Sequence, residues 1–242
     1  MKATSIDFVF ALFEFVILLF SLSFHECAHA WMASRLGDQT ARLQGRVTLN
    51  PIHHIDPIGT LLFPALMIFG PLLGFGGARF LLGWAKPTPV MTRNFKNIRR
   101  DDNLTTLAGP ASNLVLVLVS FIVLVILMVA PFPGGQDAVV NAANHQLNPQ
   151  GETILQAVAL LASLSIEVNL ALMFFNLLPI PPLDGSHILR NMLPYNALET
   201  YDQLGRFGFV LILILGQFIV PFFMNPAIAV VDAGLSLFLR QG

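Results

Sequence analysis

Long runs of apolar residues dominate the chain, and several are long enough to cross a lipid bilayer. A transmembrane helix needs about 20 consecutive apolar residues. Five segments meet or approach this requirement: Phe8–Ala33, Leu104–Val129, Thr153–Leu178, Phe207–Phe223 and Met224–Leu239. Pro221 and Pro226 interrupt the last two of these segments, which therefore form either one bent span or two short ones. The pattern predicts an all-α polytopic membrane protein.

A sixth apolar segment, Ile58–Phe75, differs from the others because prolines and glycines interrupt it. The flanking loops help to place it, since cytoplasmic loops carry an excess of Lys and Arg. Loops Ser34–Asp56 and Arg79–Asp102 contain several basic residues, whereas loop Pro131–Gly151 contains none. If the basic loops share the cytoplasmic side, Ile58–Phe75 must enter and leave on that side. We therefore expect a re-entrant hairpin or two short helices there, and about five to six transmembrane or re-entrant helices in total.

The composition agrees with a membrane protein and narrows the partners. Of the 242 residues, 55% are hydrophobic and 11% are charged, and the mean hydropathy is +0.71. Soluble domains contain about 25% charged residues, so we expect a lipid bilayer as the surroundings. The net charge of −1 without a large basic patch argues against nucleic acid as a partner. We expect one transmembrane domain over residues 1–242, with a catalytic core at about 8–193 and C-terminal anchoring helices at about 205–239.

A short polar motif near the cytoplasmic end of the first span is the best candidate for chemistry. Residues 25–29 read His-Glu-Cys-Ala-His, which fits the pattern HExxH. On a helix, His25 and His29 lie on one face and can hold one Zn²⁺, while Glu26 activates a metal-bound water. Catalytic zinc needs a third protein ligand, which must come from elsewhere in the chain. The motif is short enough to arise by chance, but ionisable residues inside a membrane are costly and usually mark function.

Polar residues at the ends of two other spans are further candidates. Asp184 follows the prolines that end Thr153–Leu178, which puts it on the same membrane face as the two imidazoles, although Asp-Gly is also a common turn pair. Asn113 can donate a hydrogen bond to a substrate carbonyl or to an oxyanion, but helix packing explains it equally well. Asn176 needs a partner in hydrocarbon, which is either a neighbouring helix or a substrate amide.

Together these motifs resemble the site-2 protease family of intramembrane zinc metalloproteases, in its compact prokaryotic form without a PDZ or CBS domain. The resemblance rests on HECAH at 25–29, GPASN at 109–113 and NLLPIPPLDG at 176–185. NPIHHIDPIGT at 50–60 and GWAKPTPV at 83–90 also resemble this branch. The resemblance implies that one zinc ion per chain is held by His25, His29 and Asp184. It also implies that Glu26 acts as general base and then as proton donor to the leaving amine.

The resemblance implies roles for residues around this centre as well. Asn113 and Asn176 would position the substrate or stabilise the oxyanion. The segment Gly83–Val90 resembles the family's membrane-associated strand, which pairs with an unwound substrate by strand addition. From their positions alone, His187 and His54 are candidate hydrogen-bond partners of the metal ligands, although a structural role in its loop is the simpler interpretation of His54.

The expected function is therefore the hydrolysis of peptide bonds in membrane-spanning proteins, as in regulated intramembrane proteolysis. The expected location is the plasma membrane of a prokaryote, with the site near the cytoplasmic face. One alternative is a transporter or ion pathway, which predicts ionisable residues at several depths, whereas Leu104–Val129 has none. The other is a catalytically silent homologue that binds transmembrane partners, against which the intact Glu26 and both histidines argue. The sequence leaves the oligomeric state open.

Overall fold

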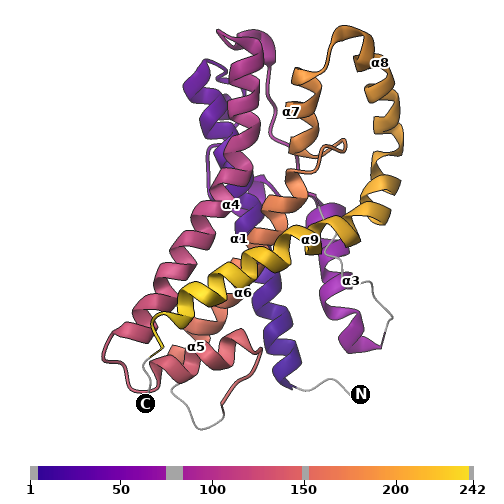
Figure 1. Cartoon of the computed structure of the whole chain (residues 1–242). Coiled ribbons are helices and arrows are strands. Elements are labelled where there is room, and N and C mark those ends of the chain that lie inside the picture. The colour runs from indigo at the N-terminus through magenta and orange to yellow at the C-terminus, as the bar shows by residue number, and fades with distance from the viewer. Residues whose placement is uncertain (1–4, 75–83, 149–152, 240–242) are drawn as a thin grey trace.

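Four long helices form the frame of the molecule in a computed structural model that describes residues 5–74, 84–148 and 153–239 (Figure 1). They are α1 (Ser5–Leu36), α4 (Ile98–Val129), α6 (Thr153–Asn176) and α9 (Gly208–Ser236). Each contributes to one of four segments that are long and apolar enough to cross a membrane. A shorter apolar helical segment covers Pro57–Phe69. Among the described residues, these elements confirm the prediction of an all-α polytopic membrane protein.

Shorter elements connect the long helices. The α-helices among them are α2 (Thr40–Leu43), α3 (Phe63–Phe69), α5 (Gly135–Ala143), α7 (Asp184–Met192) and α8 (Tyr195–Leu204). Further helical turns are η1 (Pro51–His53), η2 (Pro57–Leu62), η3 (Pro71–Leu73), η4 (Thr92–Asn94) and η5 (Gly205–Phe207). α5 lies at one end of the long helices, and α7 and the top of α8 lie at the other (Figure 1).

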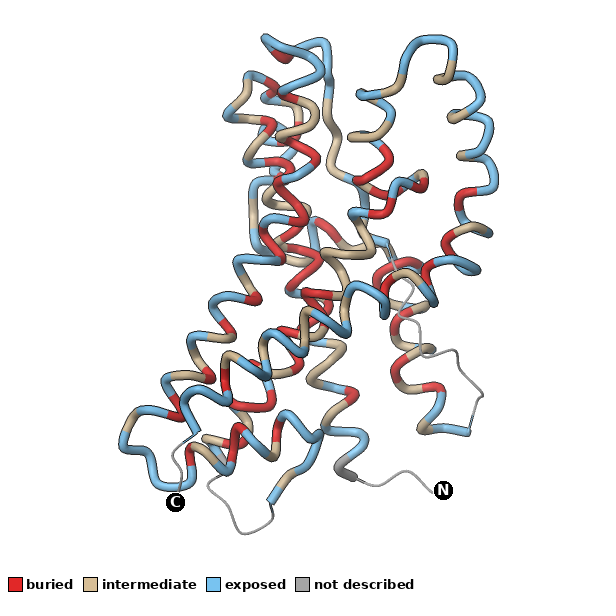
Figure 2. The backbone as a smooth tube through the Cα atoms, viewed as in Figure 1, coloured by how far each residue is buried: buried red, intermediate tan, exposed pale blue. Residues whose placement is uncertain are grey.

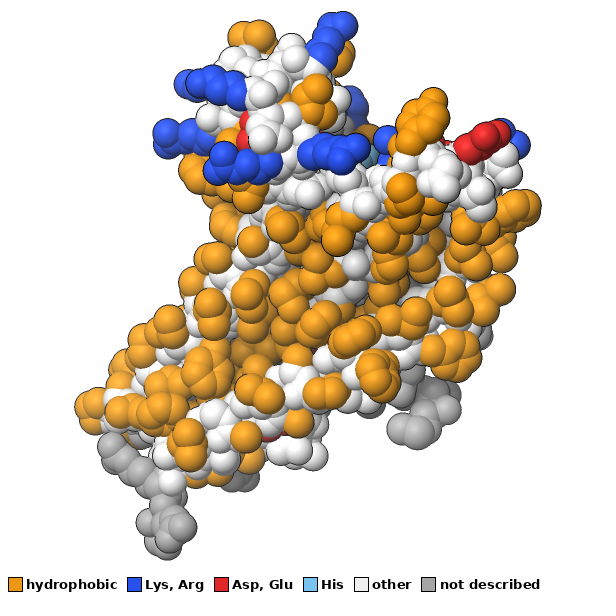
Figure 3. All heavy atoms as spheres, turned by 45° about the horizontal axis from the view of Figure 1, so that its top comes forward, with side chains coloured by type: hydrophobic (Ala, Val, Ile, Leu, Met, Phe, Trp, Pro, Cys, Tyr) orange, Lys and Arg blue, Asp and Glu red, His pale blue; other side chains and the backbone are white. Residues whose placement is uncertain are grey.

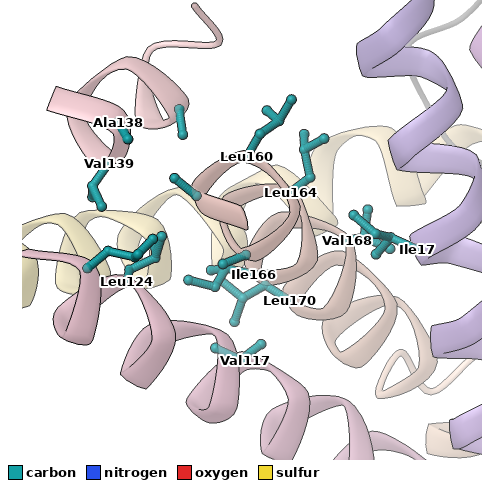
Figure 4. Packing of buried hydrophobic residues seen from close by; sticks show 14 of the residues in the cluster. Ile17, Val117, Leu124, Ala138, Val139, Leu160, Leu164, Ile166, Val168 and Leu170 are labelled. Atoms are coloured by element: carbon teal, nitrogen blue, oxygen red, sulfur yellow. The ribbon is translucent and has the colours of Figure 1, made fainter. Parts of the chain in front are cut away.

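The core is a layer of apolar side chains between α1, α4 and α6, with α9 crossing α6 (Figures 1 and 4). Leu124 of α4 and Leu160 of α6 are among the most deeply buried side chains. The outward faces of the same helices are also apolar: Leu118 and Ile122 of α4 are exposed. Figure 2 shows the exposed positions along the outer side of the long helices. Hydrophobic residues on both faces of a helix are typical of a membrane span, whose outer face meets lipid.

The C-terminal apolar region forms one helix, which decides between the two possibilities that the sequence left open. α9 runs continuously from Gly208 to Ser236, with Pro221 and Pro226 inside it. Prolines are tolerated within membrane helices because neighbouring groups satisfy the backbone carbonyls that they free. The region is therefore a single span that runs obliquely across α6 (Figure 1).

The segment that the sequence predicted to be re-entrant returns close to its starting point. Helical turns run from Pro57 to Phe69. On the far side of a stretch outside the described residues, the N–H of Trp84 donates to the carbonyl of Gly59 at 3.1 Å. The N–H of Lys86 donates to the carbonyl of His54 at 2.8 Å. Residues 84–86 thus lie beside residues 54–59, and the re-entrant topology remains a prediction.

The strand expected at Gly83–Val90 is not present in the part that the structure describes. Residues 84–90 have no regular secondary structure, and Gly83 itself lies outside the described residues. Pro87 and Pro89 lack the N–H groups that alternate positions of a strand need for a ladder, which accounts for the difference. The expectation of a short β segment is therefore wrong for residues 84–90.

Basic side chains mark one end of the molecule. Arg35 ends α1, and Arg99 and Arg100 begin α4, and all three are exposed. Figure 3 shows Lys and Arg gathered at this end, with an almost continuous hydrophobic surface below them. This distribution gives the molecule a charged end and a wide apolar belt, as expected of an integral membrane protein.

Candidate metal centre

Two histidines of α1 and the first residue of α7 meet at one place. Nε2 of His25 lies 3.0 Å from Nε2 of His29, because side chains four residues apart share a helix face. Oδ2 of Asp184 lies 3.1 Å from Nε2 of His25 and 3.3 Å from Nε2 of His29. Three side chains that commonly bind metal ions therefore converge on one point.

The turn after α6 brings Asp184 to the histidines. α6 ends at Asn176, and the prolines that follow cannot continue a helix. α7 then begins at Asp184 itself. A Cβ atom added at Gly185 would lie 2.6 Å from the carbonyl oxygen of Leu178, so only glycine allows α7 to start this close to the end of α6. The turn thus directs the carboxyl group back toward α1.

The three side chains are largely shielded from solvent. His25 is 4% exposed and His29 is 8% exposed. Burial opposes ionisation of Asp184, but the two imidazoles beside it hold the pKa of its carboxyl well below its usual range. Oδ2 of Asp184 is buried and faces Nε2 of His25 and Nε2 of His29. A buried carboxylate is costly unless a protonated imidazole or a metal ion pairs with it.

The outer nitrogens of both imidazoles are already bonded. Nδ1 of His29 lies 2.7 Å from the backbone carbonyl of Thr105, and Nδ1 of His25 lies 2.6 Å from Oδ1 of Asn113. A carbonyl only accepts, so His29 donates through Nδ1 and turns Nε2 toward Asp184. Two ring nitrogens and a carboxylate oxygen within 3.3 Å repel one another unless a proton or a metal ion lies between them. Imidazoles bonded through the outer nitrogen are the usual arrangement of metal-binding histidines.

A glycine of α4 leaves room beside the ring nitrogens. A Cβ atom added at Gly109 would lie 2.6 Å from Nε2 of His25 and closer still to Nε2 of His29. Any larger residue would therefore fill the space on which the two rings converge. Two imidazoles and one carboxylate with an open side are also a common ligand set of catalytic zinc. The residues present fit such an ion.

The carboxyl group of Glu26 is held by the segment around Thr88. Oε2 of Glu26 accepts a hydrogen bond from the backbone N–H of Thr88 at 3.0 Å, and the Thr88 hydroxyl lies 2.8 Å from the same oxygen. The hydroxyl also lies 3.1 Å from the backbone carbonyl of Glu26. The segment around Thr88 thus lies against α1 at the residue that stands next to the first histidine.

Comparison with known proteins identifies the family. The model of the family described as "Peptidase family M50" matches residues 13–215, which include all three converging side chains and Glu26. The chain belongs to peptidase family M50. Membership confirms the predicted class, a zinc metalloprotease of the site-2 protease type. It also confirms the expectation of a zinc cofactor.

Similar curated proteins carry names of the same class. The "Putative zinc metalloprotease YwhC" of Bacillus subtilis (strain 168) is 36% identical over 212 residues, which cover 85% of this chain and 80% of that protein. Two relatives named "Putative zinc metalloprotease Rip2" come from Mycolicibacterium smegmatis and Mycobacterium tuberculosis (strain H37Rv). They are 31% and 29% identical, over 81% and 84% of this chain and 63% and 65% of their own lengths. No solved structure matches the chain.

Two asparagines that the sequence assigned to substrate occupy different surroundings in this M50 chain. Asn113 is fully buried behind His25, and its NH₂ group donates to Asn169 at 2.8 Å. The observed contacts of Asn113 are with His25 and Asn169, so its predicted role toward the substrate remains a prediction. Asn176 ends α6 and is partly exposed, and its NH₂ group donates to the carbonyl of Leu172 at 3.0 Å. Asn176 therefore remains the candidate for a substrate contact.

The two further histidines differ in their surroundings. His54 is 1% exposed, and its Nε2 lies 2.9 Å from the carbonyl of Thr48, so its observed contact is within its own loop. His187 is exposed on α7, three residues after Asp184. No contact of either ring with a metal-binding side chain is recorded among the described residues, so their predicted role remains a prediction.

Three contacts of the site were not predicted from the sequence. Asn169 lies in an apolar span, where an amide always needs a partner, so its presence was a readable signal. The hydroxyl of Thr88 gives no such signal, because its contact depends on how the chain returns from the re-entrant element. The carbonyl of Thr105 gives none either, because every residue has a backbone carbonyl.

Proposed function

We propose that the chain is an intramembrane zinc endopeptidase that hydrolyses peptide bonds of membrane-spanning proteins. The observation that carries the proposal is the convergence of His25, His29 and Asp184 within 3.3 Å, beside α1, which is long and apolar enough to cross a membrane. His25 precedes the end of α1 at Leu36 by eleven residues, which is roughly 16 Å of helix rise. This distance supports a centre beside the membrane-spanning part of α1.

The proposed roles follow from the chemistry of each group. His25, His29 and Asp184 hold the metal, which when bound activates water and polarises the carbonyl of the bond to be cut. Glu26 accepts a proton from the attacking water and passes it to the nitrogen of the leaving amine. Thr88 keeps the Glu26 carboxylate in one orientation through two hydrogen-bond donors. Asn176, at the partly exposed end of α6, is the proposed contact for the substrate backbone.

The basic end of the molecule supports an orientation. Cytoplasmic loops of membrane proteins carry the excess of Lys and Arg, and exposed arginines lie where α1 ends and α4 begins. We therefore propose that this end faces the cytoplasm, so that peptide bonds near the cytoplasmic side of a substrate helix are cut. A helical peptide bond is shielded from attack, so the substrate must be locally unwound. The proposed location of this protein is the plasma membrane of a prokaryote.

The test uses the purified full-length chain in proteoliposomes with a model transmembrane peptide. Wild-type protein is expected to cut the peptide, to lose the activity when a chelator removes zinc, and to regain it when zinc is restored. Glu26→Gln should retain zinc and lose at least about 100-fold in cleavage rate, since it removes the general base. His25→Ala should lose zinc as well as activity.

Each alternative function predicts a different result in the same experiment. A silent homologue would bind zinc and peptide and leave the peptide intact. A transporter would move ions across the proteoliposome membrane without cutting the peptide. Full cleavage by the Glu26→Gln protein would refute the proposed mechanism.

A further inference from the structure

A chain of buried polar groups extends from the metal centre into the middle of the helix bundle. Oδ1 of Asn113 lies 2.6 Å from Nδ1 of His25, and Nδ2 of Asn113 donates to Oδ1 of Asn169 at 2.8 Å. Nδ2 of Asn169 donates in turn to the backbone carbonyl of Ser165, also at 2.8 Å. Both asparagines are 0% exposed. This hydrogen-bonded series joins α1, α4 and α6.

The backbone carbonyl of Ser165, at the end of this series, determines the direction of every hydrogen bond in it. A backbone carbonyl only accepts, so Asn169 turns its NH₂ group toward Ser165 and its amide oxygen toward Asn113. Asn113 must then turn its NH₂ group toward Asn169 and its oxygen toward His25. Because an amide oxygen only accepts, His25 donates through Nδ1. Nε2 of His25 is then the nitrogen that faces the metal position.

The two histidines are held in different ways. His29 donates to the backbone carbonyl of Thr105, which no side-chain change can reverse. His25 depends on an amide, and an amide can present either its oxygen or its NH₂ group. A reversed Asn113 would donate to Nδ1 of His25 and move the ring proton to Nε2, the nitrogen that must bind the metal. Asn169 is the residue that prevents this reversal.

We propose that Asn169 is a positioning residue of the metal centre, which acts through Asn113 to fix the orientation and tautomer of the His25 ring. This inference rests on the proposed zinc endopeptidase. A purely structural role, in which the amides only tie helices together, makes a different prediction. It predicts a loss of stability with unchanged metal binding.

The first test compares Asn169→Leu with Ser165→Ala in the full-length protein. Leu at 169 leaves Asn113 free to reverse. Ala at 165 removes a hydroxyl that lies 2.9 Å from Ser120 Oγ and 3.3 Å from Nδ2 of Asn169, but it keeps the carbonyl that accepts from Asn169 at 2.8 Å. Zinc affinity is measured by competition with a chromophoric chelator, and the ligand set is followed by the visible spectrum of the Co²⁺ form. Asn169→Leu should bind zinc about 10- to 100-fold more weakly, with an altered Co²⁺ spectrum. Ser165→Ala should match the wild type in both.

The second test uses two substitutions of Asn113, the middle member of the hydrogen-bonded series. Asn113→Asp keeps an acceptor for Nδ1 of His25, while Asn113→Ala removes it, and both break the hydrogen bond to Asn169. Both should lower the melting temperature, but only Asn113→Ala should lose zinc affinity, again by about 10- to 100-fold. This pair decides the question even if Asn169→Leu does not fold.

The outcomes separate the inference from the function on which it rests. A wild-type protein that binds no zinc overturns the metal centre and the inference together. Zinc binding by the wild type, with equal affinity in Asn169→Leu or with equal losses in Asn113→Asp and Asn113→Ala, overturns the inference alone.

Discussion

Gly109→Ala tests the location of the metal centre with the smallest possible change, one methyl group. The added Cβ would lie 2.6 Å from Nε2 of His25, whereas ordinary contacts begin at 3.4 Å. That ring must therefore move by 0.8 Å (3.4 minus 2.6), and the ring of His29 by more. Neither ring can retreat freely, because their outer nitrogens are held at 2.6 Å by Asn113 and at 2.7 Å by Thr105.

The expected magnitude follows from the tolerance of a zinc–nitrogen bond. Such bonds are about 2.0–2.1 Å long, and functional sites keep them within about 0.2 Å. A displacement of 0.8 Å exceeds that tolerance several-fold, so at least one ligand is lost. Loss of a hydrogen bond to a ligand already costs about 10- to 100-fold in affinity, so loss of a ligand should cost more than about 100-fold. In free energy this is more than about 2.7 kcal/mol.

The assay measures zinc affinity by chelator competition in detergent, with helix content from circular dichroism as the check on folding. Gly234→Ala is the matched control, since it also adds a methyl group to a glycine inside a long helix. The added Cβ would lie 3.1 Å from the edge of the Phe121 ring. Gly234 is near the C-terminal end of α9, and this end of α9 lies far from α7, which carries Asp184 (Figure 1). The control should bind zinc like the wild type. Unchanged zinc affinity in a folded Gly109→Ala protein would refute the position of the metal beside α4.

Two further predictions concern the segment that lies against α1. Thr88→Val removes the hydroxyl 2.8 Å from Glu26 but keeps the backbone donor, so kcat should fall by about tenfold while zinc affinity stays unchanged. Thr92→Val, an exposed isosteric change in the same segment, is the control, and equal kcat in both variants would contradict the reasoning. For Asp38, burial opposes ionisation, but donors that include the N–H of Met91 at 2.7 Å hold the pKa of its carboxyl below its usual value. This stabilisation is present above the unfolded-state pKa of about 3.9 and is lost as the pH falls through the lower folded-state value. The stability advantage of the wild type over Asp38→Asn, followed by chemical denaturation, should therefore shrink between about pH 5 and pH 3, and a constant difference would contradict it.

The convergence of His25, His29 and Asp184 was predictable from sequence because each side chain carries its own signal. A histidine pair with helical spacing in an apolar run and an aspartate after a run of prolines are both costly inside a membrane unless they are used. Topology then put Asp184 at the same end as His25 and His29, and the structure brings the three within 3.3 Å. The predicted strand failed for the opposite reason. It rested on resemblance to a known segment, whereas Pro87 and Pro89 remove donors that a ladder requires.

What the sequence did not reveal is how one face of α4 builds the surroundings of the metal. Thr105, Gly109 and Asn113 are four residues apart in turn, so they form a single stripe along the helix. The first supplies a backbone carbonyl to His29, the second leaves space beside the ring nitrogens, and the third supplies an amide oxygen to His25. The stripe is visible in the sequence only as small and polar residues, which are equally typical of helix packing. It acquires its chemical meaning when α4 packs against α1 in register with the two histidines, so this part of the site is a property of the packing between helices.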